Sequence, residues 1–246
     1  MISKSHTKYI QSLQHKKFRD ESGQFVAEGP KTVLELLEGK SFVCKEMFAL
    51  EDWLSANEML LTKSKGTELN VIKDFELEKI SALTTPNKVL AVFEKRTVES
   101  NVQFNGKITL VLDSIQDPGN FGTIIRTADW FGISTIVCSP TSADMYNPKV
   151  VQSTMGSLGR VNILYEDLVS WIKQNDSIRT YAAVLEGKPV NKVKGITEGA
   201  IIIGNEGKGI GEDVMGLVNE KITIARKGAA ESLNAAVATG IILSQL

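Results

Sequence analysis

Histidine and cysteine are scarce in this chain of 246 residues, since each occurs only twice. Zinc and iron sites draw mainly on these side chains, and no CxxC or HExxH spacing is present, so we expect no metal site. Cys44 and Cys138 each lie inside an apolar run, where a thiol packs as a small hydrophobic group. We therefore expect both to be buried, with no disulfide between them.

Long apolar runs are also missing. No stretch approaches the ~20 residues of a membrane-spanning helix. The N-terminal stretch MISKSHTKYIQSLQHKKF lacks the apolar centre of a signal peptide. Apolar residues make up 42% of the chain and charged residues 23%, which excludes disordered, collagen-like and coiled-coil proteins. These features predict a globular cytoplasmic protein that does not enter a membrane.

A strong net charge is absent too. The formal net charge is −1, so the field of the whole molecule gives no indication of a polyanionic partner. The N-terminus is nevertheless locally basic, because several cations precede the first acidic residue, Asp20. These cations are Lys4, Lys8, Lys16, Lys17 and Arg19. Two interpretations stay open here: a solvated helix face, or a surface for nucleic-acid phosphates.

Apolar strand-like segments alternate with helix-like segments, a pattern typical of an α/β fold with a mostly parallel sheet. The polar stretch 97–106 ends in Asn-Gly and shows neither period, so it is predicted to be a linker. It separates a small N-terminal α/β domain, residues 1–96, from a C-terminal α/β domain, residues 107–246. In the first domain we expect helices over 3–13, 30–38 and one capped by Asp74, and strands over 24–28, 42–50 and 89–93.

In the second domain, the sequence predicts a longer alternation of strands and helices. The expected strands are 108–112, 135–138, 161–164, 181–184, 200–203 and 221–224. The expected helices are 122–131, 149–155, 167–174, 211–217 and 233–246.

Three glycine-bearing turns follow predicted strands, at residues 113–132, 201–211 and 222–240. Ligands of open α/β sheets bind beyond the carboxyl ends of strands, so the three turns could build one site. Gly204 and Gly209 have the glycine spacing of a P-loop, but the Lys-Ser/Thr that must follow is missing. A Rossmann GxGxxG is absent as well, and the turns therefore do not predict a nucleotide site of either kind.

The three turns carry NFGTIIRTA (120–128), GNEGKG (204–209) and ESLN (231–234). In this order and separation they resemble the three motifs of the SpoU/TrmH-type RNA ribose 2′-O-methyltransferases of the SPOUT superfamily, and the resemblance covers residues 107–246. The segment 5–28 additionally resembles the start of the small substrate-binding domain that many of these enzymes carry. The resemblance implies S-adenosylmethionine bound in a deep C-terminal trefoil knot, and an obligate homodimer with active sites at the subunit interface.

The resemblance also implies roles for single residues. Arg126 would contact the reacting ribose or its phosphate. Because a guanidinium is effectively never deprotonated, we interpret it as a positioning group and not as a base. Asn120 and Glu206 would order this arginine, and Ser232 and Asn234 would lie near the ribose. Without the resemblance, Arg126 reads as a surface residue, Asn120 as a helix cap and Ser232 as an N-cap.

Further positions follow from the same comparison. Gly204, Ile224 and Leu233 match the residues whose backbone groups hold the cofactor. The basic N-terminal residues Lys4, Lys8, Lys16, Lys17 and Arg19 would contact the RNA backbone. Gln152 to Ser157 resembles a Ser-x-Gly-Ala stretch of the family but departs from it at Ser157 and at residues 159–161. The role of residues 153–161 therefore stays open.

The function predicted from these features is transfer of a methyl group from S-adenosylmethionine to a ribose 2′-hydroxyl of rRNA or tRNA, without a metal. Two alternatives are a SPOUT-like dimer that binds RNA without catalysis, and a SPOUT enzyme that methylates a base. The presence together of Asn120, Arg126, Glu206, Ser232 and Asn234 argues against the first. The sequence does not identify the RNA or the nucleotide.

Overall fold

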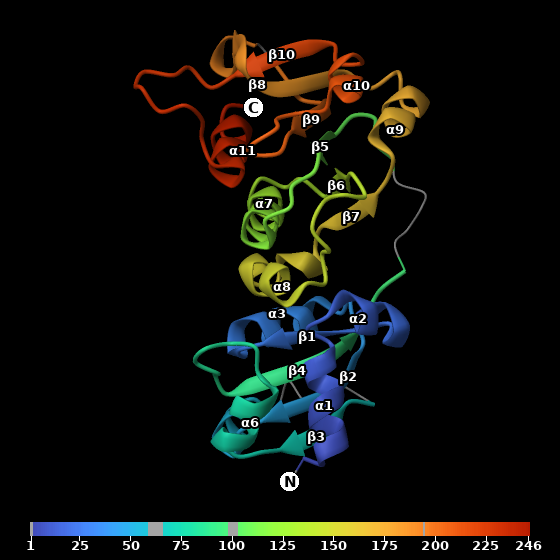
Figure 1. The fold of residues 1–246 in the computed structure, drawn as a ribbon, viewed down its shortest axis with the longest axis vertical. Coiled ribbons are helices and arrows are strands. Elements are labelled where there is room, and N and C mark those ends of the chain that lie inside the picture. The colour runs from blue at the N-terminus through green and yellow to red at the C-terminus, as the bar shows by residue number, and fades with distance from the viewer. Residues whose placement is uncertain (1, 59–65, 98–102, 194) are drawn as a thin grey trace. The chain divides into compact units, whose positions relative to one another are not determined.

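The computed structural model describes residues 2–58, 66–97, 103–193 and 195–246, which form two compact units (Figure 1). Unit 1 consists of Met1–Thr97 together with Asp144–Arg160, and unit 2 of Val98–Ala143 with Val161–Leu246. The sequence assigned residues 144–160 to the C-terminal domain, whereas the structure packs them with the N-terminal residues. Most of the expected linker, residues 98–102, lies outside the described residues.

Unit 1 contains a sheet of four strands in the order β1-β4-β2-β3. These strands are β1 (Gln24–Glu28), β2 (Cys44–Ala49), β3 (Glu68–Val71) and β4 (Val89–Glu94). The last strand in the chain, β4, lies between β1 and β2 and runs antiparallel to both, while β2 and β3 are parallel. The sheet is therefore mixed, and a mostly parallel arrangement applies only to unit 2.

Helices cover both faces of this sheet. On one face, α1 (Lys4–Ser12) and α6 (Asp74–Ile80) contribute Ile10, Leu77 and Ile80 to a core with Phe48 and Leu90. On the other, α3 (Pro30–Gly39) and α8 (Pro148–Thr154) contact β1 and each other. The short helices α2 (Lys16–Ser22), α4 (Glu51–Ala56) and η1 (Ser157–Gly159) complete the unit.

Residues 144–160 join unit 1 through close contacts with α3. Gly156 has φ of +92°, and a Cβ there would overlap the side chain of Glu35, so this position requires glycine. Arg160 pairs with Glu35 at 2.8 Å, and the Ser41 hydroxyl donates to the Gly159 carbonyl at 2.5 Å. The stretch that sequence reasoning left unexplained thus forms part of the N-terminal core.

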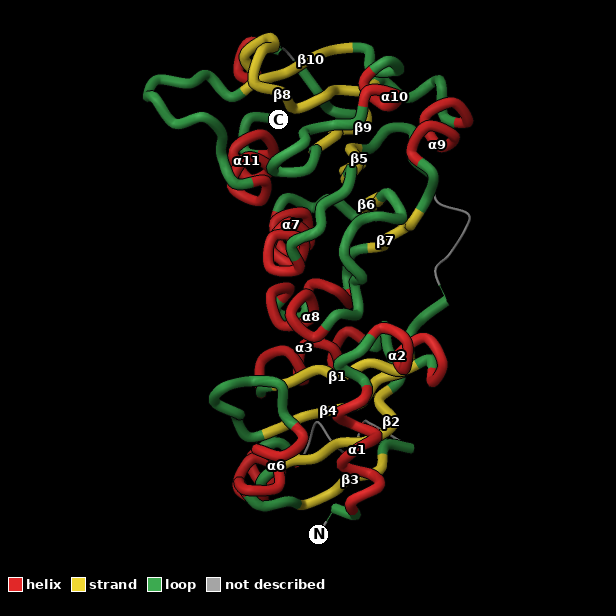
Figure 2. Tube along the Cα trace, viewed as in Figure 1, coloured by secondary structure: helices red, strands yellow, loops and turns green. Residues whose placement is uncertain are grey.

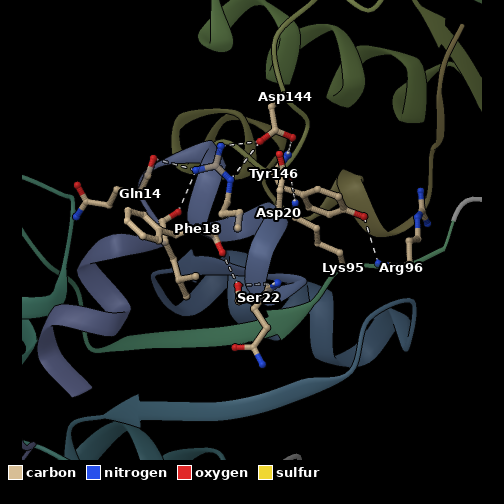
Figure 3. A network of polar contacts seen from close by, with 11 residues as sticks. Gln14, Phe18, Asp20, Ser22, Lys95, Arg96, Asp144 and Tyr146 are labelled. Carbon is tan, nitrogen blue, oxygen red and sulfur yellow. Dashed lines mark hydrogen bonds and ion pairs between the residues drawn. The ribbon is translucent and has the colours of Figure 1, made fainter. Parts of the chain in front are cut away.

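A polar network that includes Asp144 and Tyr146 joins the same segment to N-terminal residues (Figure 3). Arg19 is only 1% exposed, and its Nη2 lies 2.6 Å from Asp144 Oδ2. Its Nη1 donates to the carbonyls of Leu13 and Gln14, each at 2.9 Å. Nearby, Lys95 pairs with Asp20 at 2.6 Å, and this contact lowers the pKa of Asp20. The partners of the Arg19 guanidinium, Leu13, Gln14 and Asp144, all belong to unit 1.

Unit 2 contains a six-stranded sheet in the order β10-β8-β9-β5-β6-β7, in which every described pairing is parallel. The strands are β5 (Ile108–Leu112), β6 (Thr135–Cys138), β7 (Asn162–Tyr165), β8 (Thr180–Pro189), β9 (Gly199–Ile203) and β10 (Glu220–Thr223). Their carboxyl ends meet at one edge, where the three glycine-bearing turns begin. The expected α/β fold with a mostly parallel sheet is confirmed for this unit.

The central strands of unit 2 are covered on both faces. Val111, Val137 and Ile202 pack against Leu168 and other residues of α9 (Leu168–Gln174). Alternate residues of the same strands face the other side. There α7 (Pro118–Trp130) and α11 (Ala235–Leu243) lie next to each other, as Figure 1 shows. The short elements η2 (Val190–Lys192) and α10 (Glu212–Met215) complete the unit.

Both cysteines are free and buried, as expected. Burial raises the pKa of the Cys44 thiol to about 11 and also raises that of Cys138. Among the described residues, no helix is long and apolar enough to cross a bilayer.

Candidate functional site

The first motif builds the start of α7. Asp117 caps the helix by accepting a hydrogen bond from the Asn120 backbone N–H at 2.7 Å, and Pro118 occupies its first position. The helix therefore begins earlier than the expected residue 122. Asn120 lies in the first turn and is not the cap, so its side chain is available for other contacts.

Asn120, Glu206 and Asn234 come from three different motifs and form one chain of hydrogen bonds. Asn120 Nδ2 donates to Glu206 Oε1 at 2.6 Å, and Asn234 Nδ2 donates to Asn120 Oδ1 at 2.8 Å. Asn234 Oδ1 accepts from the backbone N–H groups of Ala236 and Val237. A carboxylate only accepts, so Glu206 dictates the orientation of the Asn120 amide, and that amide dictates the orientation of Asn234.

Asn234 is also the N-cap of α11. The helix begins at Ala235, two residues later than the sequence predicted, and the cap role considered for Ser232 belongs to Asn234. Ser232 is exposed in the preceding loop. The chain of amides therefore connects the start of α7, the loop after β9 and the start of α11.

Arg126 stands apart from this chain. It lies on α7 six residues after Asn120, roughly 9 Å along the helix and about 240° around it. Its side chain is exposed, and no described residue accepts a hydrogen bond from it or pairs with it. The structure does not bring Arg126 into contact with Asn120 or Glu206, which were expected to order it.

The loop after β9 is a tight hairpin whose geometry depends on Asn205. Asn205 and Gly209 exchange two backbone hydrogen bonds, of 3.0 and 2.9 Å. Asn205 Oδ1 accepts from the N–H groups of Gly207 and Lys208. At Gly204, a Cβ would lie 2.5 Å from the Ile210 nitrogen and 2.6 Å from the Gly209 oxygen, so a side chain cannot fit.

A polar network at the carboxyl end of β5 holds this hairpin in place. Asn205 Nδ2 donates to the Ser114 carbonyl at 2.9 Å, and Asp113 Oδ2 accepts from the Gly211 N–H at 2.8 Å. Ser114 adopts φ of +58°, which is unusual for a residue with a side chain, and its N–H donates to Ser139 Oγ. Sequence reasoning missed Asp113, Ser114 and Asn205, although all three lie inside the glycine-bearing turns.

A pocket of about 880 Å³ opens at this edge of unit 2, within the size range of small-molecule sites. It is lined by the expected cofactor residues Gly204, Ile224 and Leu233, and by Glu206 and Ser232. Ile203 and Ile242 give the pocket an apolar wall, and such a wall suits the flat face of an adenine. Residues 225–234 are all exposed, and most of them line the pocket, so polar backbone groups are available beside that wall. The residues present therefore fit S-adenosylmethionine.

The basic N-terminal residues have different environments. Lys4 and Lys8 on α1, and Lys16 and Lys17 on α2, are exposed. Arg19 was expected to contact RNA, and this prediction was wrong for the described conformation, because Arg19 is buried and paired with Asp144. Within the described ranges, no group of three His, Cys, Asp or Glu side chains is arranged to hold a metal ion.

Comparison with known proteins places this geometry in a family. The model of the SpoU rRNA methylase family matches residues 107–244, and that of an MRM3-like substrate-binding domain matches residues 4–91. The 23S rRNA (guanosine(2553)-2′-O)-methyltransferase RlmP of Bacillus subtilis is 28% identical over 237 residues, which are 95% of this chain and 92% of RlmP.

Solved structures agree with these matches. A TrmH-family protein of Porphyromonas gingivalis superposes with a TM-score of 0.88 at 35% identity, covering 100% of this chain and 98% of that one. An AdoMet-bound rRNA methyltransferase of Sinorhizobium meliloti gives a TM-score of 0.88 at 28% identity, covering 100% and 95%. The chain belongs to the SpoU rRNA methylase family.

Proposed function

We propose that this protein is an RNA ribose 2′-O-methyltransferase that uses S-adenosylmethionine and acts on rRNA. The observation that carries the proposal is the hydrogen-bond chain of Asn120, Glu206 and Asn234, because Glu206 lines the pocket that fits the cofactor. The rRNA substrate is supported by the name of RlmP and by the family.

S-adenosylmethionine supplies a methyl group on a positively charged sulfur, so the methyl carbon is already electrophilic. The protein must then hold the ribose hydroxyl in line with that carbon, and positioning of two reactants alone can supply ~7–11 kcal/mol of the barrier. Arg126, exposed and without a partner among the described residues, is suited to bind a backbone phosphate beside the reacting ribose. Glu206 lies at the pocket and orients Asn120, which in turn orients Asn234.

Labelled S-adenosylmethionine and unmodified RNA test the activity. Purified protein is incubated with rRNA and, separately, with tRNA, and the labelled product is hydrolysed in alkali. A ribose 2′-O-methyl group blocks cleavage at its own phosphate, so the label should appear in dinucleotides. Label in mononucleotides would indicate base methylation, and RNA binding without label would indicate the non-catalytic alternative.

We also propose that the active form is a homodimer whose subunits contact each other through α7 and α11. We propose further that the C-terminal domain contains the trefoil knot that the resemblance implies. Trp130, at the end of α7, is 84% exposed, and Val237 on α11 is 51% exposed. Apolar side chains exposed together on two adjacent helices are typical of association surfaces. Arg126 lies one turn before Trp130 on the same side of α7, so a second copy seated on Trp130 would border the proposed ribose site.

Light scattering measures this association directly. Trp130→Glu should convert the dimer to a monomer with unchanged secondary structure, because a charge would replace the apolar contact. Val71→Glu is a matched control, since Val71 is 59% exposed and lies on β3 of unit 1, outside α7 and α11. A wild-type protein that is monomeric at assay concentration would contradict the proposal.

The proposed RNA contacts of unit 1 now rest on Lys4, Lys8, Lys16 and Lys17, without Arg19. A cytoplasmic location stays a prediction.

A further inference from the structure

The loop between β10 and α11 carries charges that the cofactor site does not explain. Figure 2 shows this segment as a long loop that extends away from the sheet of unit 2. Arg226 and Lys227 lie in it, and both are exposed. Binding residues lie disproportionately often on loops that a rigid scaffold positions.

The rim of the pocket is richer in positive than in negative charge. Lys208, Arg226 and Lys227 all line it, from two separate loops. Among the described residues, neither lysine has an ion-pair partner, and Arg226 makes a 3.4 Å hydrogen bond to the Ala230 carbonyl. Two carboxylates also line the pocket: Glu231, and Glu206, which is engaged by Asn120.

The cofactor's own charge is the wrong sign for such a rim. Near neutral pH, S-adenosylmethionine carries a sulfonium and an ammonium group against one carboxylate, so its net charge is positive. Its carboxylate offers a place for one cation, not three. The second substrate carries a negative charge at every nucleotide, and arginine and lysine are the side chains that bind phosphate.

We propose that Lys208, Arg226 and Lys227 form a phosphate-binding site for the RNA backbone at the mouth of the pocket. The inference rests on the proposed function, because it assigns these residues to the RNA substrate of that same pocket. The site holds the nucleotides that flank the methylated ribose, and it adds to the contacts of unit 1. RNA bound there covers the exposed loop 225–234.

The test compares two matched double variants for binding to an rRNA fragment over a salt range of about 50 to 200 mM. Arg226→Gln with Lys227→Gln removes two rim charges. Lys107→Gln with Lys173→Gln removes two exposed charges at the opposite edge: Lys107 precedes β5, and Lys173 lies in the last turn of α9, which leads to the amino end of β8. The logarithm of the RNA-binding constant falls as the logarithm of the salt concentration rises, and each lost phosphate contact reduces the magnitude of this slope by ~0.7 for single-stranded RNA.

We expect the rim variant to reduce the magnitude of that slope by about 1.4, and added Lys208→Gln to reduce it by about a further 0.7. The control variant should keep the wild-type slope, and all variants should bind S-adenosylmethionine as the wild type does. Hydrogen exchange of residues 225–234 should slow when RNA is added, in the wild type but not in the rim variant.

A rim variant with the wild-type salt slope would overturn the inference. If that variant also lost affinity for S-adenosylmethionine, the cations would serve the cofactor carboxylate instead. A wild-type protein that binds RNA but transfers no methyl group contradicts the proposed function instead, and the slope comparison still decides on the rim.

Discussion

Removal of the Asp144 carboxylate should destabilise unit 1 strongly and leave unit 2 intact. Arg19 is 1% exposed and Asp144 has a side-chain exposure of 14%, so Asp144→Ala leaves a guanidinium buried without its counter-charge. Breaking a buried pair by removing one partner costs about 3–5 kcal/mol. The carbonyls of Leu13 and Gln14 still accept from Arg19, so we expect the lower end, about 3 kcal/mol, or more than a hundredfold in the unfolding equilibrium.

Hydrogen exchange read by mass spectrometry separates the two units. Amides of β1 and α3 should exchange about a hundredfold faster in Asp144→Ala, while amides of β5 and β9 keep wild-type rates. Arg19→Met combined with Asp144→Ala should recover most of the loss, because no buried charge remains and methionine fills the space.

Lys45→Ala is the control within the same unit. Lys45 and Glu94 form an ion pair of 3.2 Å in which both side chains are 44% exposed, and such surface pairs contribute at most about 1 kcal/mol. Wild-type exchange of β1 and α3 in Asp144→Ala would refute the reasoning. So would a double variant no more stable than the single one.

Three further outcomes are expected. Gly204→Ala should weaken S-adenosylmethionine binding at least tenfold by calorimetry, because its Cβ would overlap the backbone of residues 209 and 210. Gly207→Ala is the control and should bind normally, because its Cβ has only one contact, at 3.6 Å. Equal affinities of the two variants would contradict the hairpin argument. Arg126→Ala should lower methyl transfer by about 10²- to 10³-fold with unchanged cofactor affinity. Arg126→Lys should recover little of the lost activity if orientation by the guanidinium dominates. Near-wild-type turnover of the alanine variant would remove this residue from the mechanism. Burial raises the pKa of Glu28, so the folded form favours the protonated carboxyl and stability is lost as the pH rises through that raised pKa. Relative to Glu28→Gln, the wild type should lose stability in urea unfolding as the pH rises above about 4.3, the ordinary pKa of a glutamate, and a constant difference would contradict this.

Local patterns predicted much of the strand content. β1, β5 and β6 were predicted with their observed bounds, because each is a short apolar run between turn residues. Sequence reasoning missed β3 and α2. β3 is an edge strand that is mostly exposed, and α2 buries only Arg19, so neither shows an apolar period. The central place of β4 also depends on long-range pairing that no local pattern records.

The candidate site was predicted through its motifs more than through its contacts. Asn120, Glu206 and Asn234 were identified by resemblance, and the structure joins them. The supporting roles of Asp113 and Asn205 arise from hydrogen bonds across 98 and 91 residues of chain, which a linear reading does not reveal. Arg19 was misassigned because a charge in a basic run reads as exposed, and its burial depends on Asp144, 125 residues away.

The path of the chain through the two units has a consequence for synthesis on the ribosome. Unit 1 needs residues 144–160, so it cannot be completed when Thr97 has been added. At ~5–20 residues per second, the next 63 residues take roughly 3–13 s. During that interval the nascent N-terminal segment carries Arg19 without its carboxylate, and β5, α7 and β6 are made before the carboxylate arrives. The substrate-binding unit should therefore mature only after part of the methyltransferase unit has been synthesised.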